Sequence, residues 1–241
     1  MKRTERHHLK DNELAHFASA ARHTVEERKK QATIGLIAVV ALLVLVIGFL
    51  AWRSRGAARS SQLLADALVV TEAPVGPPPA PGAPAAGLRF STERERYEAS
   101  LAKFKAVADQ YPSSESGIFA RYREAATQMA LGNAKDAAAA YQLVIDRAGS
   151  SHYGQMGRLG LADAQARNGQ LDQAISTYKT LAEQKDGPLP VDGILMQLGR
   201  AYLDAGKHAD AEQTFNRLVS EFPQSPFTSD ARRELDSLKK T

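Results

Sequence analysis

The chain has 241 residues, a formal net charge of +4 and no cysteine. Without cysteine it holds no disulfide, thiolate metal site, catalytic thiol or lipidated N-terminal cysteine. Its charges are placed unevenly: residues 1–56 carry ten Lys or Arg and five Asp or Glu, whereas residues 57–241 carry 21 and 22. The larger C-terminal part lacks the basic bias that nucleic-acid binding requires, so nucleic acid is excluded as its partner.

Residues 1–32 form a polar, charged N-terminal segment in which Leu14, Phe17, Ala21 and Val25 stand at near-helical spacing. Two interpretations stay open, a solvated cytoplasmic tail with transient helix and a cytosolic docking peptide. The segment also holds four histidines. We expect no metal site there, because a flexible tail lacks the fixed geometry that ligation needs.

Residues 33–52 carry no charge and consist mainly of Ile, Leu, Val and Ala. As a helix, a segment of this length crosses a hydrocarbon core of about 30 Å. A signal peptide would have a shorter apolar region and a small-residue cleavage site, whereas this run ends in Phe49, Leu50, Ala51 and Trp52. We therefore predict a retained single-pass anchor in the lipid bilayer, with Trp52 at the headgroup level.

Basic residues flank the predicted span unequally, eight before it against Arg53, Arg55 and Arg59 after it. The positive-inside rule then places the N-terminus in the cytoplasm and sends the C-terminal part across the membrane, into the periplasm or its equivalent. The basic residues directly before the span fit anionic lipid headgroups.

Residues 53–73 contain leucines and small residues, which predicts a membrane-proximal helix able to supply an apolar face to a helix later in the chain. Residues 74–90 are rich in proline and exclude a regular helix, so we expect an extended linker there. A ligand for a proline-recognition domain is the alternative interpretation of this linker.

The remaining residues, 91–241, repeat with a period of 37 residues. The repeat is marked by aromatic residues at Phe104, Tyr141, Tyr178 and Phe215. Small residues precede them by four positions at Ser100, Ala137, Ala174 and Ala211, and glycines by nine at Gly132, Gly169 and Gly206. Apolar residues follow them by three positions at Val107, Val144, Leu181 and Leu218. This stripe has helical spacing and needs neighbouring repeats to bury it.

The pattern predicts helical pairs that stack along the chain. The expected helices span residues 91–111, 114–131, 134–148, 152–168, 171–185, 190–205, 208–222 and 226–240. The last of them has a polar outer face, as the soluble end of a repeat array requires.

The last copy of the repeat is the sharpest. It reads Leu198, Gly199, Tyr202, Gly206, Ala211, Phe215, Leu218 and Pro223. This spacing resembles the tetratricopeptide repeat family, although that family repeats every 34 residues or so. The resemblance implies an all-α fold, an α-solenoid of about three and a half to four repeats behind a single transmembrane helix.

In proteins that resemble this family, the first helix of each repeat lines a concave surface that binds protein partners. Projected onto this chain, the groove positions are Phe119, Tyr122, Met129, Met156, Leu159, Arg167, Met196, Arg200, Leu203 and Arg233. Methionine suits a surface that accepts varied apolar segments, and arginine can pair with acidic groups or chain termini. Core packing stays open as the alternative role for the methionines.

The sequence carries no phosphate-binding loop, zinc-protease motif or nucleophile elbow, so we expect neither an enzyme nor a cofactor or small-molecule substrate. The order of tail, span and exported repeats resembles the YfgM-like ancillary subunits of the SecYEG translocon. That resemblance implies an inner-membrane adaptor with a periplasmic C-terminal domain, which binds export clients and hands them to chaperones. An envelope assembly scaffold with one specific partner is the alternative.

Overall fold

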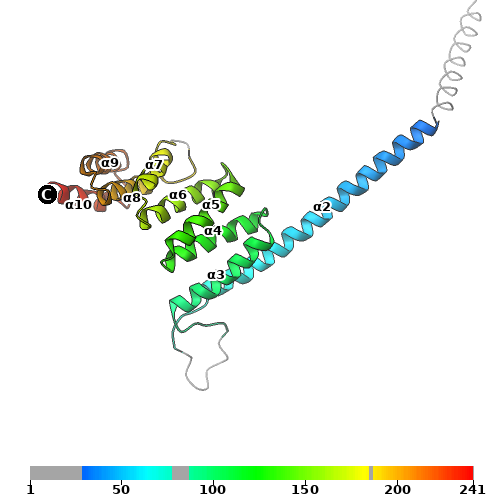
Figure 1. Ribbon diagram of the computed structural model, residues 1–241, viewed down its shortest axis with the longest axis horizontal. Helices are drawn as coiled ribbons and strands as arrows, with labels where there is room; N and C mark the ends of the chain where they lie inside the picture. The colour runs from blue at the N-terminus through cyan, green and yellow to red at the C-terminus, as the bar shows by residue number, and fades with distance from the viewer. Residues whose placement is uncertain (1–28, 78–86, 185–186, 241) are drawn as a thin grey trace, which may run out of the picture. The chain divides into compact units, whose positions relative to one another are not determined.

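The computed structural model describes residues 29–77, 87–184 and 187–240. The predictions for the N-terminal segment, a tail or a docking peptide, fall almost entirely on residues 1–28, outside the described residues. The described part is all-α, as predicted, except for one isolated bridge between Val75 and Phe90. Its helices, labelled in Figure 1, are α2 (Lys29–Glu72), α3 (Glu93–Gln110), α4 (Glu115–Ala130), α5 (Ala134–Ala148), α6 (His152–Arg167), α7 (Leu171–Ala182), α8 (Val191–Asp204), α9 (His208–Glu221) and α10 (Thr228–Leu238).

Local signals set the ends of these helices. The hydroxyl of Ser114 accepts a hydrogen bond of 3.0 Å from the backbone N–H of Gly117, which caps the N-terminus of α4. The glycines that repeat every 37 residues have positive φ angles, +85° at Gly132, +76° at Gly169 and +70° at Gly206. Glycine adopts this left-handed conformation without steric cost, so the chain turns at these positions from one helix of a pair into the next.

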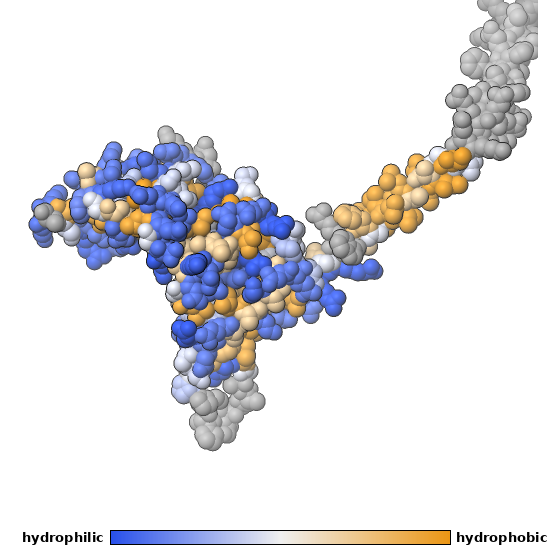
Figure 2. Space-filling view, in the orientation of Figure 1, coloured by the Kyte–Doolittle hydropathy of each residue, from blue (hydrophilic) through white to orange (hydrophobic). Residues whose placement is uncertain are grey.

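The chain divides into two compact units, Met1–Arg55 and Gly56–Thr241. In the first unit α2 is apolar and its Ile, Leu and Val side chains are exposed, a hydrophobic surface visible in Figure 2. Among the described residues one helical stretch, Thr33–Glu72, is long and apolar enough to cross a membrane. These properties fit a membrane anchor and a signal sequence alike.

In the second unit the end of α2 packs against the first predicted repeat. Ala67 is fully buried against Phe104 and Val107 of α3, with Leu63 and Leu64 beside it. The end of α2 therefore forms a helical pair with α3. The boundaries of the five segments expected from the sequence, residues 1–32, 33–52, 53–73, 74–90 and 91–241, stay predictions.

The proline-rich segment joins these two helices, and its described ends lie together. The N–H of Gly76 donates a hydrogen bond of 3.0 Å to the carbonyl oxygen of Phe90. The N–H of Phe90 donates one of 3.1 Å to the carbonyl oxygen of Pro74. These bonds close the segment at its base, between α2 and α3.

The predicted apolar stripe forms the core of the repeats. The four periodic aromatics are all buried, with exposed fractions of 0% for Phe104 and Phe215, 2% for Tyr178 and 5% for Tyr141. Close helix contacts accompany them: a Cβ atom built on Gly199 would lie 2.3 Å from the ring of Phe215. Burial of these rings against neighbouring helices supplies the apolar contact that one isolated helix could not make.

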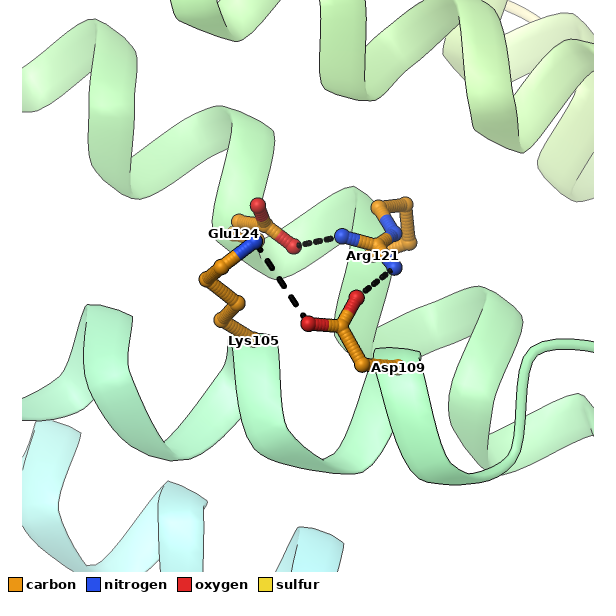
Figure 3. A network of polar contacts seen from close by, with 4 residues as sticks. All are labelled: Lys105, Asp109, Arg121 and Glu124. Carbon is orange, nitrogen blue, oxygen red and sulfur yellow. Dashed lines mark hydrogen bonds and ion pairs between the residues drawn. The ribbon is translucent and has the colours of Figure 1, made fainter.

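A charged network links α3 to α4 (Figure 3). Arg121 pairs with Asp109 across the two helices and donates to Glu124 at 2.6 Å, while Lys105 lies 3.4 Å from Asp109. The hydrogen bond from Arg121 lowers the pKa of Asp109, whereas burial raises the pKa of Glu124 despite the same arginine. The network thus joins the first helical pair to the second, beside their apolar contacts.

Candidate functional site: a hollow on alternate helices

The predicted groove residues lie on alternate helices of the array. Phe119, Tyr122 and Met129 belong to α4, Met156, Leu159 and Arg167 to α6, Met196, Arg200 and Leu203 to α8, and Arg233 to α10. Helices α4 and α6 contact each other, as do α6 and α8. The side chains on these three helices can therefore contribute to one continuous surface.

A hollow of about 380 Å³ opens on this surface. Three of the predicted groove residues line it, Met129, Arg167 and Arg200. The rest of its lining is formed by Ala126, Tyr141, Asp163, Ala166, Tyr178, Gln197 and Asp204. The hollow thus combines an apolar part, two tyrosines and charges of both signs.

Met196 is placed differently from the prediction. It is fully buried in the same core cluster as Leu195 and Phe215, so its side chain reaches no open surface. The correction has a simple cause: α8 packs against α7 and α9 as well as α6, which encloses most of its faces. The alternative interpretation, core packing, is the right one for this methionine.

The other predicted residues lie outside the lining of the hollow. The ring of Phe119 lies 5.8 Å from that of Tyr153, and the ring of Tyr122 lies 5.7 Å from that of Tyr141. Leu159 and Leu203 are half-buried against the C-terminal core cluster, and Met156 is half-buried on α6. Arg233 is exposed and pairs with Asp230. Whether these six residues contact a partner stays a prediction.

Asp163 and Tyr178 form a polar pair in the lining of the hollow. The hydroxyl of Tyr178 donates a hydrogen bond of 2.6 Å to Oδ1 of Asp163. Burial raises the pKa of Asp163, and the Tyr178 hydrogen bond and the nearby Arg167 oppose that rise. Burial also raises the pKa of Tyr141 and of Tyr178, so both phenols stay neutral at ordinary pH.

Packing explains why the tyrosines reach this place. The ring of Tyr141 lies against α6 at Gly160, where a built Cβ atom would be 2.4 Å from the ring. The 37-residue spacing predicts both tyrosines as core aromatics, and it does not predict their place in the lining of the hollow. Asp163 is not among the predicted groove residues; its one sequence signal is a carboxylate between two alanines, Ala162 and Ala164, which the structure shows to be fully buried.

The charged residues at the opening of the hollow differ in their pairing. Arg200 lies 3.8 Å from Asp230 of α10, with 45% of its side chain exposed. Arg167 is exposed and forms no ion pair with a described residue. Within the described ranges no group of three or more His, Asp or Glu side chains could hold a metal ion.

The repeats match known proteins over the part of the chain that forms the hollow. Residues 122–190 and 159–226 match the family model for the tetratricopeptide repeat. No curated protein matches the sequence. Residues 122–226 thus carry tetratricopeptide repeats, as the spacing of the last copy predicted, whereas a YfgM-like identity has no support from this match.

Solved structures share the fold at low identity. Two structures of the nearly identical TPR-like repeats of a protein from Podosopora anserina, described as a kinesin light chain, are 15% identical to this chain and match 61% of it with a TM-score of 0.54. The match spans 79% and 80% of those chains. A tetratricopeptide repeat protein from Parabacteroides merdae is also 15% identical over 61% of this chain and 56% of its own, with a TM-score of 0.50. Likeness at this identity indicates the fold alone.

Proposed function

We propose that this chain, whose residues 122–226 carry tetratricopeptide repeats, is a membrane-anchored adaptor that binds segments of other proteins in the hollow. Tetratricopeptide repeats imply protein–protein interaction. The observation that carries the proposal is the composition of the hollow, in which Met129 and Tyr141 offer apolar contact beside the polar side chains of Asp163, Gln197 and Arg200. Pockets of this kind hold a ligand by apolar contact and fix its orientation by a few polar groups.

A polypeptide segment fits this site better than a small molecule does. The hollow is open and its lining comes from five helices, α4 to α8, so a ligand that fills it must bridge several repeats. An extended chain can make such a bridge, with one side chain in the hollow and its neighbours along the helices. An extended, flexible chain loses conformational freedom when it binds, so we expect binding of this kind to be weak and broad.

We further propose that this adaptor acts beside the protein-export channel of the inner membrane. It is supported by the apolar stretch of α2 and by the excess of Lys and Arg on its N-terminal side, which favours a periplasmic location for the repeats. An adaptor in that position would hold emerging polypeptides for chaperones. A scaffold for envelope assembly with one specific partner would have the same topology, and the two differ in the proteins that they bind.

The test is photocrosslinking of the full-length protein in its native membrane. A photoreactive amino acid replaces Ala126 or Gln197, which line the hollow, or Gln213, an exposed residue of α9 outside it. Capture of translocon subunits together with many exported chains from the first two positions supports the export adaptor. One dominant envelope protein instead supports the scaffold, and equal capture from Gln213 refutes the hollow as the binding site.

A further inference from the structure

We propose that Asp163, held by Tyr178, is the anchor for a basic side chain, lysine or arginine, of the polypeptide bound in the hollow. This inference rests on the proposed function, because it names the kind of residue that enters the same site. It starts from the position of Asp163 in the middle of α6, between two fully buried alanines. A half-buried carboxylate in such surroundings loses hydration, so it favours any partner that restores its lost hydrogen bonds.

One oxygen of this carboxylate is occupied and the other is available. Oδ1 accepts the hydroxyl of Tyr178 at 2.6 Å, which fixes the orientation of the carboxylate. Oδ2 accepts no hydrogen bond from a described residue, and it is not fully buried. Its lone pairs are therefore open to a donor that enters the hollow, and an N–H group of a ligand supplies such a donor.

Arg167 does not neutralise Asp163 by a direct contact. The two residues are four positions apart on α6, yet no ion pair within 4.0 Å joins them, and the guanidinium of Arg167 is exposed. Arg167 opposes the rise of the Asp163 pKa through space only. Arg167 therefore leaves the carboxylate without a close counter-ion, and a ligand cation can take that place.

The surroundings of Asp163 suit the long stem of a basic side chain. Ala126, Met129 and Ala166 line the same hollow and are only half-buried, so their apolar surfaces can contact the methylene groups of lysine or arginine. An acidic side chain would instead bring a second carboxylate against Asp163, so the hollow disfavours an acidic residue at this position.

The burial of Asp163 favours a positively charged ligand side chain over a negatively charged one. A pair formed with the half-buried Asp163 is less screened by water than one formed with exposed Arg167 or Arg200. Arg200 already has Asp230 as a partner. The strongest electrostatic preference of the hollow is therefore for a cation at Asp163, and the arginines modulate which residues flank it.

The test uses the full-length protein in detergent micelles and three fluorescein-labelled apolar peptides that differ only at a central Lys, Gln or Glu. Fluorescence anisotropy measures their affinities. We expect the wild-type protein to bind the Lys peptide about tenfold more tightly than the Gln peptide, as a charge-assisted hydrogen bond would give. The Glu peptide should bind least tightly of the three.

Asp163→Asn provides the decisive variant, because its side chain still accepts the Tyr178 hydroxyl but carries no charge. It should bind the Lys and Gln peptides equally. Asp204→Asn, which removes an exposed carboxylate from the same hollow, is the matched control and should keep the preference for Lys. A circular dichroism melt establishes that each variant is folded. Tyr178→Phe removes the hydroxyl from Oδ1 but keeps the charge of Asp163, so this variant should still bind the Lys peptide more tightly than the Gln peptide.

The outcomes separate the anchor from the binding site itself. Equal affinity of the wild-type protein for all three peptides, with binding lost when Gln197 is replaced by Trp, would overturn the anchor and leave the proposed function standing. No binding of any peptide would overturn both. Loss of the Lys preference in Asp204→Asn but not in Asp163→Asn would overturn the assignment of the anchor to Asp163.

Discussion

Replacement of Gly199 by alanine should destabilise the repeats, although alanine favours helices. Gly199 is buried on α8, and a built Cβ atom would lie 2.3 Å from Cε1 and 2.6 Å from Cζ of Phe215. Carbon atoms pack at about 3.5–4.0 Å, so the ring or the helix must move by more than about 1 Å. Phe215 is fully buried, which leaves its ring little room to shift.

The expected magnitude follows from two opposing effects. Overpacking of a core costs about 1–3 kcal/mol, and so tight a contact belongs at the upper end. The gain in helix propensity from glycine to alanine returns about 1 kcal/mol. The net loss is therefore about 2 kcal/mol, which lowers the Tm by roughly 4–8 °C for a domain of this size.

Thermal unfolding followed by circular dichroism measures this loss, and α8 offers its own control. A Cβ atom built on Gly193 would lie 3.5 Å from the ring of Phe227, an ordinary contact. Gly193→Ala should therefore keep the Tm or raise it by a few degrees, because only the propensity gain applies. If the two variants unfold at the same temperature, the ring of Phe215 does not constrain Gly199 and the reasoning fails.

Phe104→Ala should lower the free energy of unfolding by about 3–5 kcal/mol in urea titrations, because the ring is fully buried between α2, α3 and α4; a loss under about 1 kcal/mol would contradict this packing. Burial raises the pKa of Glu124 above its usual value of 4.5, so the native state holds the proton more tightly and this residue's contribution to stability falls as the pH rises from 4.5 through the raised pKa. Glu124→Gln should flatten that part of the stability profile, and an unchanged profile in urea unfolding would refute the assignment. Asp163→Asn should unfold at pH 7 with a Tm equal to or above that of the wild-type protein, because the amide keeps the bond from Tyr178 and avoids the penalty of a buried charge; a marked drop would show that the charge stabilises the fold.

The sequence predicts the helices well because local end signals at several boundaries coincide with the periodic apolar stripe. Serine or glycine marks the ends, as at Ser114 and Gly206, and the aromatic of every repeat keeps its place on the buried face. Periodicity of this kind depends only on the helix and its immediate neighbours, so it can be read from one chain. The predicted helix ends accordingly lie within a few residues of the observed ones.

The hollow is harder to predict because it depends on which surfaces the helices leave uncovered. Met129 and Met196 are both methionines on first helices, yet one lines the hollow and the other is fully buried in the core. Tyr178 is a core aromatic by spacing and contributes its hydroxyl to the hollow through Asp163. Such double roles arise from packing between helices, which sequence spacing does not encode.

The C-terminal end of α2 decides where a fragment of the repeats without the apolar stretch can begin. A repeat array needs a helix at each end to cover its apolar faces. At the C-terminal end α10 contacts α9 and presents exposed Arg232 and Arg233 to water. At the other end Ala67 covers Phe104, and the compact unit begins at Gly56. The segment after the apolar stretch is therefore part of the folded repeats, and a soluble fragment that starts beyond this segment would expose the ring of Phe104 to water.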